Sequence, residues 1–333
     1  MNIVVLAGGL SMERDVSLTS GSRIANTLRD AGHNAVLVDL YYGIEKEKMS
    51  FDSSFGRYEY KIPEREPDLN ELIASNGGRK NPIGENVIEF CKMADVAFLA
   101  LHGGVGENGK LQALLEMNGV RFTGSSSVGC MLSMDKIISK ELIAREGIPT
   151  AEWLTNKSGR NELKDLIPCF VKPADNGSSV GVTKVVNEAE LEAALNEAEK
   201  FSDNVLIEKQ VLGREFSVGI LEGKALPPIE IIATGDFYNY TVKYQAGLAR
   251  EICPAPISDE LTIKLQSYAE RAHRALRLGS YSRIDFIMDA SGEFFFLEAN
   301  ALPGMTPTSL LPQEAAANGM SYTELCLKLI ELA

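Results

Sequence analysis

Short apolar runs alternate with helical patterns in the first third of the chain. Asn2 precedes five apolar residues that read as a buried strand, and two glycines then lead into a helical pattern that Gly32 ends. The apolar runs predict strands at 2–7, 34–40 and 95–101, and the helical periodicity predicts helices at 15–31 and 109–118. Strands that alternate with helices favour a parallel sheet, so we expect an α/β domain over residues 1–124.

Residues 41–94 interrupt this order. The stretch is rich in charged residues, Gly and Pro, and its periodicity is weak. Only residues 58–62 fit a strand, which would lie at a sheet edge. We expect an elaboration of the first domain that forms either ordinary surface or a dimer contact.

Strands and helices follow a different order after Ser125. The pattern predicts strands at 169–172, 205–209, 215–221 and 225–232, and helices at 135–146, 188–200, 259–276 and after a capping box that begins at Ser321. The segment 215–232 fits a hairpin about Glu222-Gly223. Residues 235–253 fit a mobile loop. We therefore expect two α+β units, at 125–212 and 213–333.

A second hairpin is predicted near the end of the chain. Residues 283–288 alternate in polarity, residues 289–292 fit a four-residue turn, and a second strand follows at 293–300. This turn would pair Met288 with Glu293 and Asp285 with Phe296.

Glu298 would then lie diagonal to Asp285 on one face of the hairpin, with Asn300 further along and Arg283 at the edge. Two carboxylates and a carboxamide are hard oxygen ligands, and Mg²⁺ prefers one or two carboxylates together with substrate phosphates. The alternative is a solvated strand face, on which acids are common. The apolar character of the opposite face argues against that alternative, and so do phosphate-binding patterns upstream.

Composition and charge narrow the class of protein. The chain has 333 residues, of which 45% are hydrophobic and 24% charged, so it is long enough for two or three domains and is not expected to be disordered. Its formal net charge of −13 argues against nucleic acid or an anionic membrane as a main partner. The five cysteines form no CxxC pair, and no run approaches the roughly 18 apolar residues of a membrane span. With no signal-peptide pattern, we expect a cytoplasmic protein with reduced thiols.

A Gly/Ser loop between two short strands is the first candidate for phosphate binding. Lys172 ends the first strand, and residues 176–181 can offer backbone N–H groups to phosphate oxygens. The loop does not have the P-loop pattern, and an ordinary hairpin loop is the alternative. Glu208 and Glu215 are strand-end acids that could accept from ribose or sit on the surface.

Polar residues also follow two strands of the first domain. Glu13 and His102 come after its strands, and ligands of open α/β sheets bind at the carboxyl ends of the strands. The alternative for His102 is a hydrogen-bonded loop histidine.

Taken in order, these features resemble the ATP-grasp superfamily, and in detail the D-alanine–D-alanine ligases. The resemblance covers nearly the whole chain except residues 41–94. It rests on the following motifs: Ala7-Gly8-Gly9 with Glu13-Arg14-Asp15-Val16-Ser17, Leu101-His102-Gly103 with Gly106-Glu107-Asn108-Gly109, Ser133-Met134-Asp135-Lys136, Val171-Lys172-Pro173 with Gly177-Ser178-Ser179-Val180-Gly181, and Leu297-Glu298-Ala299-Asn300 with Pro303-Gly304-Met305-Thr306 and Ser309-Leu310. It implies a Rossmann-like first domain at 1–124 followed by a two-part ATP-grasp fold.

The resemblance also implies a role for each matching residue. ATP would be held at its phosphates by Lys136, Lys172, Ser178 and Ser179, at adenine by Glu208, Lys209 and Val211, and at the ribose by Glu215. Two Mg²⁺ ions, which Mn²⁺ could replace, would be held by Asp285, Glu298 and Asn300. The first D-alanine would be bound by Glu13 and His102, the second by Ser309 and Leu310, and the oxyanion by Arg283 and the backbone of Gly304. Lys243 and Tyr244 would close the site, with Tyr244 bonded to Ser178 and Glu13.

The implied activity is the ATP-dependent joining of two D-alanine molecules through D-alanyl phosphate, for peptidoglycan synthesis. Tyr244 favours D-alanine as the acceptor over D-lactate, whereas D-serine is harder to exclude. Another ATP-grasp carboxylate–amine ligase and a non-catalytic nucleotide-binding module are more distant alternatives. The resemblance alone implies a homodimer. Four residues depart from the family pattern and could affect the lid or the acceptor: Asn108, Asn239, Thr241 and Val242.

Overall fold

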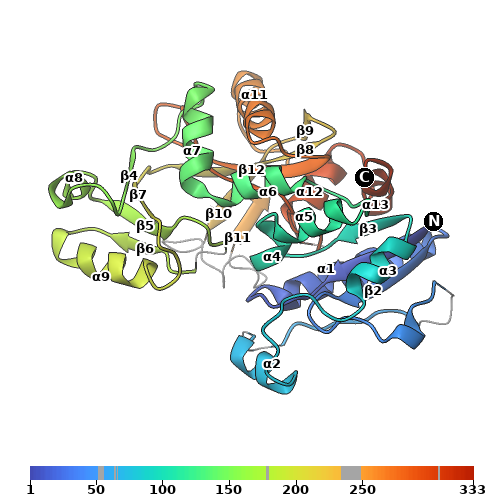
Figure 1. The fold of residues 1–333 in the computed structure, drawn as a ribbon. Helices are drawn as coiled ribbons and strands as arrows, with labels where there is room; N and C mark the ends of the chain where they lie inside the picture. Colours follow the sequence, from blue (N-terminus) through green and yellow to red (C-terminus); the bar gives the residue numbers. More distant parts are fainter. Residues whose placement is uncertain (52–55, 64, 66, 178–179, 234–248, 307) are drawn as a thin grey trace.

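Three sheets organise the chain in the computed structural model, which describes residues 1–333 except 52–55, 64, 66, 178–179, 234–248 and 307. Figure 1 shows a parallel sheet with its helices at the lower right, a small sheet on the left and a larger sheet above and between them. The family-level expectation of a parallel α/β part followed by antiparallel α+β parts is confirmed. The expected boundaries between the parts stay a prediction.

The first sheet is parallel because helices connect its strands. Its strands are β1 (Asn2–Ala7), β2 (Asn34–Asp39) and β3 (Val96–Leu99), in the order β2-β1-β3. Every residue of β1 after Asn2 is buried, as its unbroken apolar run predicts. Helix α1 (Arg14–Asp30) packs against β1 and β2, and Gly32 follows it with a φ of +88°, which suits the glycine that ends a helix.

The interrupting segment 41–94 adds short helices to this part. They are η1 (Lys46–Lys48), α2 (Leu69–Ser75) and α3 (Val87–Met93), and α3 adds buried Val87 and Phe90 to the core. The edge strand expected at residues 58–62 is wrong. The backbone of Tyr58 bonds with the side chain of Asn26 on α1, whose Nδ2 donates at 2.8 Å and whose Oδ1 accepts at 3.0 Å. A side chain therefore takes the place of the partner strand.

The small sheet is antiparallel and carries its own core. Its strands are β4 (Trp153–Thr155), β5 (Cys169–Pro173), β6 (Thr183–Val185) and β7 (Val205–Lys209), in the order β4-β7-β5-β6. Helices α8 (Arg160–Lys164) and α9 (Glu188–Ala198) contribute Leu163, Leu191 and Leu195 to the apolar cluster beneath it. This matches the strands and the helix that the sequence predicts here.

The large sheet lies at the centre of the molecule. Its strands are β8 (Arg214–Leu221), β9 (Lys224–Ala225), β10 (Ile229–Ala233), β11 (Ala249–Ile252), β12 (Tyr281–Met288) and β13 (Phe294–Asn300). The main order is β11-β10-β8-β12-β13, all antiparallel, with β9 paired to β8.

Two expectations for this sheet need correction. The second strand of the 215–232 hairpin is split into β9 and β10, because Pro227 and Pro228 between them lack N–H groups for a ladder. Of the loop expected at 235–253, residues 249–252 form β11, paired with β10. Residues 235–248 lie outside the described part of the chain.

The loop between β12 and β13 is longer than the sequence suggests. Met288 pairs with Phe294, so the expected pair of Met288 with Glu293 is wrong. Asp289 explains the difference, because its Oδ1 accepts from the backbone N–H groups of Ser291 and Glu293 at 2.9 and 3.0 Å. These bonds draw Glu293 into the loop.

The large sheet has one apolar face and one polar face. Phe216, Val218, Ile284 and Phe286 are fully buried in a core that they share with α11 (Asp259–Ala275). Side chains alternate along a strand, so the residues between them project to the opposite face. The other helices of the described residues are α4 (Gly104–Glu107), α5 (Lys110–Met117), α6 (Ser127–Met134), α7 (Lys136–Arg145), α12 (Leu310–Ala317) and α13 (Tyr322–Glu331).

Candidate active site

The β12–β13 hairpin brings its acids closer together than expected. Asp285 lies directly opposite Glu298, and Arg283 lies opposite Asn300. The expected pair of Asp285 with Phe296 is wrong, because the longer loop shifts the register by one residue and an extra residue of β13 beside Asp285 shifts it by another. Such a bulge places two residues against one. All four polar residues still share one face, as predicted.

The Asp285 carboxylate is the centre of a hydrogen-bond network and is only 4% exposed. Arg283 donates to both of its oxygens, at 2.9 and 2.8 Å. Ser217 Oγ donates to Oδ1 at 2.8 Å, and Asn300 Nδ2 donates to Oδ2 at 3.1 Å. A two-pronged guanidinium bond of this kind fixes orientation as well as charge.

Burial disfavours the charged form of Arg283, but Asp285 and Glu298 reverse that effect and raise its pKa. The side chain is therefore a permanent cation on a face that otherwise carries acids.

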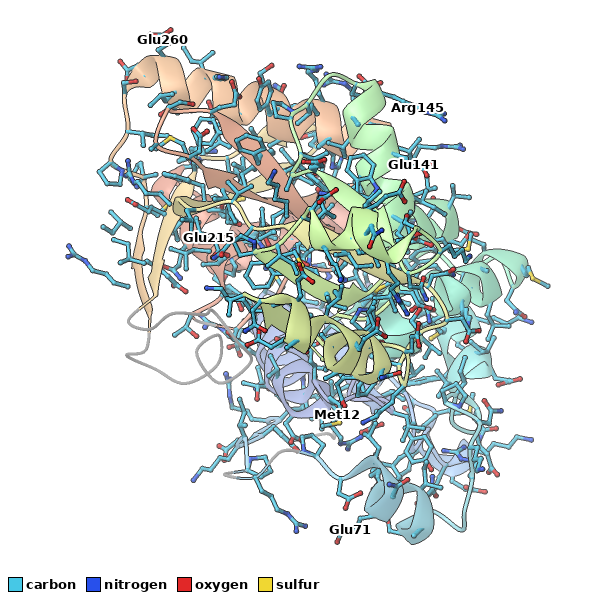
Figure 2. All side chains as sticks on the ribbon, turned by 90° about the vertical axis from the view of Figure 1, so that its left-hand side faces the viewer. Met12, Glu71, Glu141, Arg145, Glu215 and Glu260 are labelled. Atoms are coloured by element: carbon cyan, nitrogen blue, oxygen red, sulfur yellow. The ribbon has the colours of Figure 1, made fainter. Side chains whose placement is uncertain are left out.

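A cavity of about 320 Å³ opens over this face of the large sheet. It reaches from the large sheet to the parallel sheet and to the start of α7. Eleven predicted site residues line it: Glu13, His102, Lys136, Glu215, Arg283, Asp285, Glu298, Asn300, Gly304, Ser309 and Leu310. Glu215 lies toward the middle of the molecule in Figure 2, whereas Glu71 on α2 and Glu260 on α11 mark its outer ends.

The parallel sheet contributes Glu13 and His102 to the cavity wall. Glu13 is the residue before α1, and each of the two side chains is 7% exposed. Nε2 of His102 is buried and has no hydrogen-bond partner among the described residues. Burial and the nearby Arg283 lower the pKa of His102, while Glu13 opposes that shift. An unpaired ring nitrogen in a cavity wall is suited to a polar ligand.

The opposite end of the cavity is formed by the loop that precedes α12. Ser309 Oγ accepts the Thr306 N–H at 2.9 Å, so it does not cap the helix that begins at Leu310. The first backbone N–H groups of α12 are thus without a side-chain cap in the described structure. A Cβ on Gly304 would lie 2.7 Å from Ser309 Oγ, so a side chain there would displace the Ser309 hydroxyl.

The lysines expected at phosphate differ in position. Lys136 lines the cavity, and its ammonium donates to the carbonyl of Asn176. Lys172 bonds to Glu208 at 2.5 Å. Four of the described candidates do not line the cavity: Lys172, Glu208, Lys209 and Val211.

Glu208 is 3% exposed and is held between two ammonium groups. Its second partner is Lys140, which is 1% exposed, bonds to it at 2.5 Å and also donates to Thr150 Oγ1 at 2.5 Å. Burial alone would raise the pKa of Glu208, but Lys172 and Lys140 outweigh burial and lower it.

Sequence reasoning assigned no role to several residues of the site. Lys140 follows Lys136 by one helical turn, a spacing that places both on one side of α7 and that could have indicated it. Glu107 stands in a quoted motif and lines the cavity, where burial and then Glu13 raise its pKa to about 8. Ser217 carries no sequence signal, because its role arises from the pairing of β8 with β12.

Four predicted residues, Ser178, Ser179, Lys243 and Tyr244, lie outside the described part of the chain. In the part that is described, no group of three or more His, Cys, Asp or Glu side chains is arranged to hold a metal ion. The candidate metal ligands are two carboxylates and one carboxamide. No described helix is both long and apolar enough to cross a membrane.

Comparison with known proteins finds the same family for both halves of the chain. Residues 2–125 match the family described as D-ala D-ala ligase N-terminus, and residues 142–331 match D-ala D-ala ligase C-terminus. The D-alanine–D-alanine ligase of Pediococcus pentosaceus is 42% identical over 99% of this chain and 97% of its own length. That of Lacticaseibacillus casei is 39% identical over 99% and 95%.

Solved structures give the same result. The D-alanine–D-alanine ligase of Bacillus anthracis, complexed with ATP, is 31% identical with a TM-score of 0.77, over 100% of this chain and 96% of that one. A D-Ala:D-Ser ligase of Enterococcus faecalis is 27% identical with the same TM-score, over 100% and 99%. With both halves matched and full-length relatives near 40% identity, the chain belongs to the D-alanine–D-alanine ligase family.

Proposed function

We propose that this protein joins two D-alanine molecules to D-alanyl-D-alanine at the expense of ATP, for peptidoglycan precursor synthesis. One observation carries the proposal: a single cavity joins Lys136 with the residues proposed to bind D-alanine and metal ions, although they come from three separate parts of the chain. The names of the relatives and the ATP complex of a related ligase support it.

The first step activates a carboxylate. Glu13 accepts hydrogen bonds from the ammonium group of the first D-alanine, and His102 lies beside its carboxylate. A carboxylate oxygen attacks the γ-phosphorus of ATP, the bond from that phosphorus to the bridging oxygen breaks, and ADP leaves. The products of this step are D-alanyl phosphate and ADP. Phosphoryl transfer depends on position and charge neutralisation. Lys136 supplies positive charge from the cavity wall, and the family resemblance implies the same role for Lys172, which lies outside that wall.

The second step forms the peptide bond. The neutral amine of the second D-alanine attacks the carbonyl carbon, and negative charge develops on the carbonyl oxygen. Arg283 and the backbone at Gly304 stabilise that oxyanion. The bond from carbon to phosphate oxygen then breaks, and the departing phosphate takes the proton that the amine releases. The carboxylate of the second D-alanine is held at Ser309 and Leu310.

Two Mg²⁺ ions, or Mn²⁺ in their place, would be held by Asp285, Glu298 and Asn300. The donor set fits, because Mg²⁺ takes hard oxygen ligands and few protein carboxylates. A bound cation would neutralise phosphate charge. The surroundings support this, because Glu13 adds a further acid to a wall in which Arg283 and Lys136 are the cations named above.

The remaining roles follow from the family resemblance. Glu208, Lys209, Val211 and Glu215 bind the adenosine part of ATP, and Ser178, Ser179, Lys243 and Tyr244 close over the reacting groups. The protein acts in the cytoplasm as a homodimer.

D-serine is the competing acceptor, because a related D-Ala:D-Ser ligase has the same fold. A small pocket rejects an added hydroxyl group by only about 10²-fold.

The test is phosphate release by the purified protein with Mg-ATP and D-alanine, alone and mixed with D-serine or D-lactate, with product masses measured directly. We expect phosphate release that requires D-alanine and a product with the mass of D-alanyl-D-alanine. The Glu13→Gln variant should have a much higher KM for D-alanine. ATP hydrolysis at a rate that does not depend on D-alanine would reject the proposal. A mixed dipeptide as the main product would change the acceptor to D-serine.

A further inference from the structure

Helix α12 carries a buried acid that the two steps above do not use. The first residues of the helix lie at the cavity, where Ser309 and Leu310 form part of its wall. One turn further along, Glu314 is fully buried, and its Oε1 accepts the N–H of Gly219 in β8 at 2.9 Å. Glu314 therefore links the end of the cavity proposed to hold the second D-alanine to the middle strand of the large sheet.

The interruption of the neighbouring strand explains why Gly219 needs this partner. Strand β8 pairs with β9 up to Ala225 and with β10 from Ile229, and the residues between them form no ladder. The carbonyl of Gly219 accepts the N–H of Leu226 at 2.8 Å, but its own N–H has lost a strand partner. A buried N–H has to be paired. The Glu314 carboxyl supplies the missing acceptor.

The glycine makes room for the carboxyl. Gly219 does not have a positive φ, so its backbone conformation does not require glycine. A Cβ at this position would lie 2.6 Å from Oε2 of Glu314 and 2.7 Å from Cδ1 of Leu311. Gly219 is also the residue of β8 that pairs with Arg283 of β12. The contact thus lies directly beside the proposed oxyanion-binding residue.

Packing alone does not explain an acid here. Burying a carboxyl is costly unless its polar atoms are paired, and Oε2 has no partner among the described residues. Burial raises the pKa of Glu314 to about 8, although the Gly219 N–H and Arg283 oppose that shift. The carboxyl is therefore mostly neutral at pH 7, and the hydrogen bond, not the charge, is its main contribution.

We propose that Glu314 is a positioning residue for the second amino acid: its hydrogen bond to Gly219 fixes the first turn of α12 relative to Arg283. The inference rests on the proposed function, in which Ser309 and Leu310 hold the acceptor carboxylate. Leu310 and Glu314 are one helical turn apart, so a shift at Glu314 moves the acceptor site as well. A displacement of about 1 Å at a reacting centre costs on the order of 10²-fold in rate.

Competition between two nucleophiles distinguishes a positioning role for Glu314 from a general loss of stability or activity. Hydroxylamine also attacks D-alanyl phosphate and gives D-alanine hydroxamate with release of phosphate, but it has no carboxylate to be held by α12. The purified full-length protein is given Mg-ATP, D-alanine and hydroxylamine at fixed concentrations. The ratio of dipeptide to hydroxamate then reports how well the second D-alanine is placed.

Three variants and one control make the test specific. Glu314→Leu removes the hydrogen bond. Gly219→Ala adds a Cβ that displaces the Glu314 carboxyl. Both should lower the ratio by about tenfold or more, the range expected for a misplaced reactant. Glu314→Gln keeps an oxygen acceptor for the Gly219 N–H and should leave the ratio near that of the unaltered protein. Leu329→Ala, a core change in α13, should lower the melting temperature and leave the ratio unchanged.

An unchanged ratio in both Glu314→Leu and Gly219→Ala would overturn the inference, and the second variant keeps the test valid if the first does not fold. A ratio in Glu314→Gln as low as in Glu314→Leu would also overturn it, because the charge and not the hydrogen bond would then matter. If the unaltered protein makes neither product, the proposed function fails instead, and that outcome is distinct.

Discussion

Glu208 and Glu314 are both buried acids of the ATP-grasp part, yet their surroundings act on them in opposite ways. Glu208 is 3% exposed and bonds to two ammonium groups, from Lys140 and Lys172, at 2.5 Å each. Glu314 is fully buried, bonds to one backbone N–H and has an oxygen without a partner in the described structure. The pKa of Glu208 is lowered, and burial raises that of Glu314 to about 8.

The difference shows that burial alone does not decide whether an acid is charged. Desolvation favours the neutral form of both groups, and only two directly bonded cations reverse it. Glu208 therefore keeps its charge and can act as a fixed acceptor near the proposed nucleotide site. Glu314 acts through a hydrogen bond. The predictions below test the two halves of this comparison.

The largest effect at a single pH is expected on the free energy of unfolding, when a cation beside Glu208 is removed. Lys140→Met leaves the buried carboxylate with one ammonium partner. We expect the free energy of unfolding to fall by about 3 kcal/mol, near the lower end for breaking a buried ion pair, because Lys172 remains. Chemical denaturation measures it. Lys209→Met is the matched control, since its pair with Glu152 is exposed and is worth at most about 1 kcal/mol. Equal losses in the two variants would refute the comparison.

An effect of similar size is expected at Arg283, the cation that the acids of the cavity share. Arg283→Lys keeps the charge but loses the two-pronged bond to Asp285. We expect kcat for phosphate release to fall on the order of 10²–10³-fold, as for the loss of one oxyanion donor. Arg214→Lys alters a similar two-pronged pair, with Glu230, away from the cavity wall, and should leave kcat unchanged. A kcat of Arg283→Lys equal to that of Arg214→Lys would argue against the oxyanion role.

The smallest change, per pH unit, is expected in the pH dependence of stability at Glu314. Its folded pKa of about 8 is above the ordinary value near 4.3, so between these values the folded state binds more protons than the unfolded state. Stability from this group is therefore lost as pH rises through that window, by up to about 1.4 kcal/mol per pH unit. Glu314→Gln should make the fall between pH 5 and 8 shallower, as measured by denaturation at several pH values. Glu331→Gln, an exposed control, should not, and an unaltered slope in Glu314→Gln would place the carboxyl in its charged form.

Much of the fold could be predicted because local patterns agree with it. The unbroken apolar run of β1, the cap at Ser321 and the periodicity of α11 each indicate their element directly. The wrong details arise from side chains that pair with distant backbone. Asn26 takes the bonds that a strand at residues 58–62 would need, and Asp289 lengthens the hairpin loop.

The site was predictable where a motif carries it and not where tertiary pairing creates it. Glu13, Asp285 and Glu298 stand in recognisable patterns, and the cavity joins them. The bulge beside Asp285 carries no glycine or other sequence mark. Lys140 and Glu314 were assigned no role because charged residues on helices are mostly exposed. Only the packing of α7 and α12 against the sheets buries them.

The most direct test of the central claim follows one oxygen atom. D-alanine labelled with ¹⁸O at both carboxylate oxygens is turned over with unlabelled Mg-ATP, and the released phosphate is analysed by mass spectrometry. If the carboxylate attacks the γ-phosphorus of ATP in this cavity, each phosphate released with dipeptide carries one ¹⁸O atom. Dipeptide formation with unlabelled phosphate would contradict the account, because the acyl phosphate would not then be the intermediate.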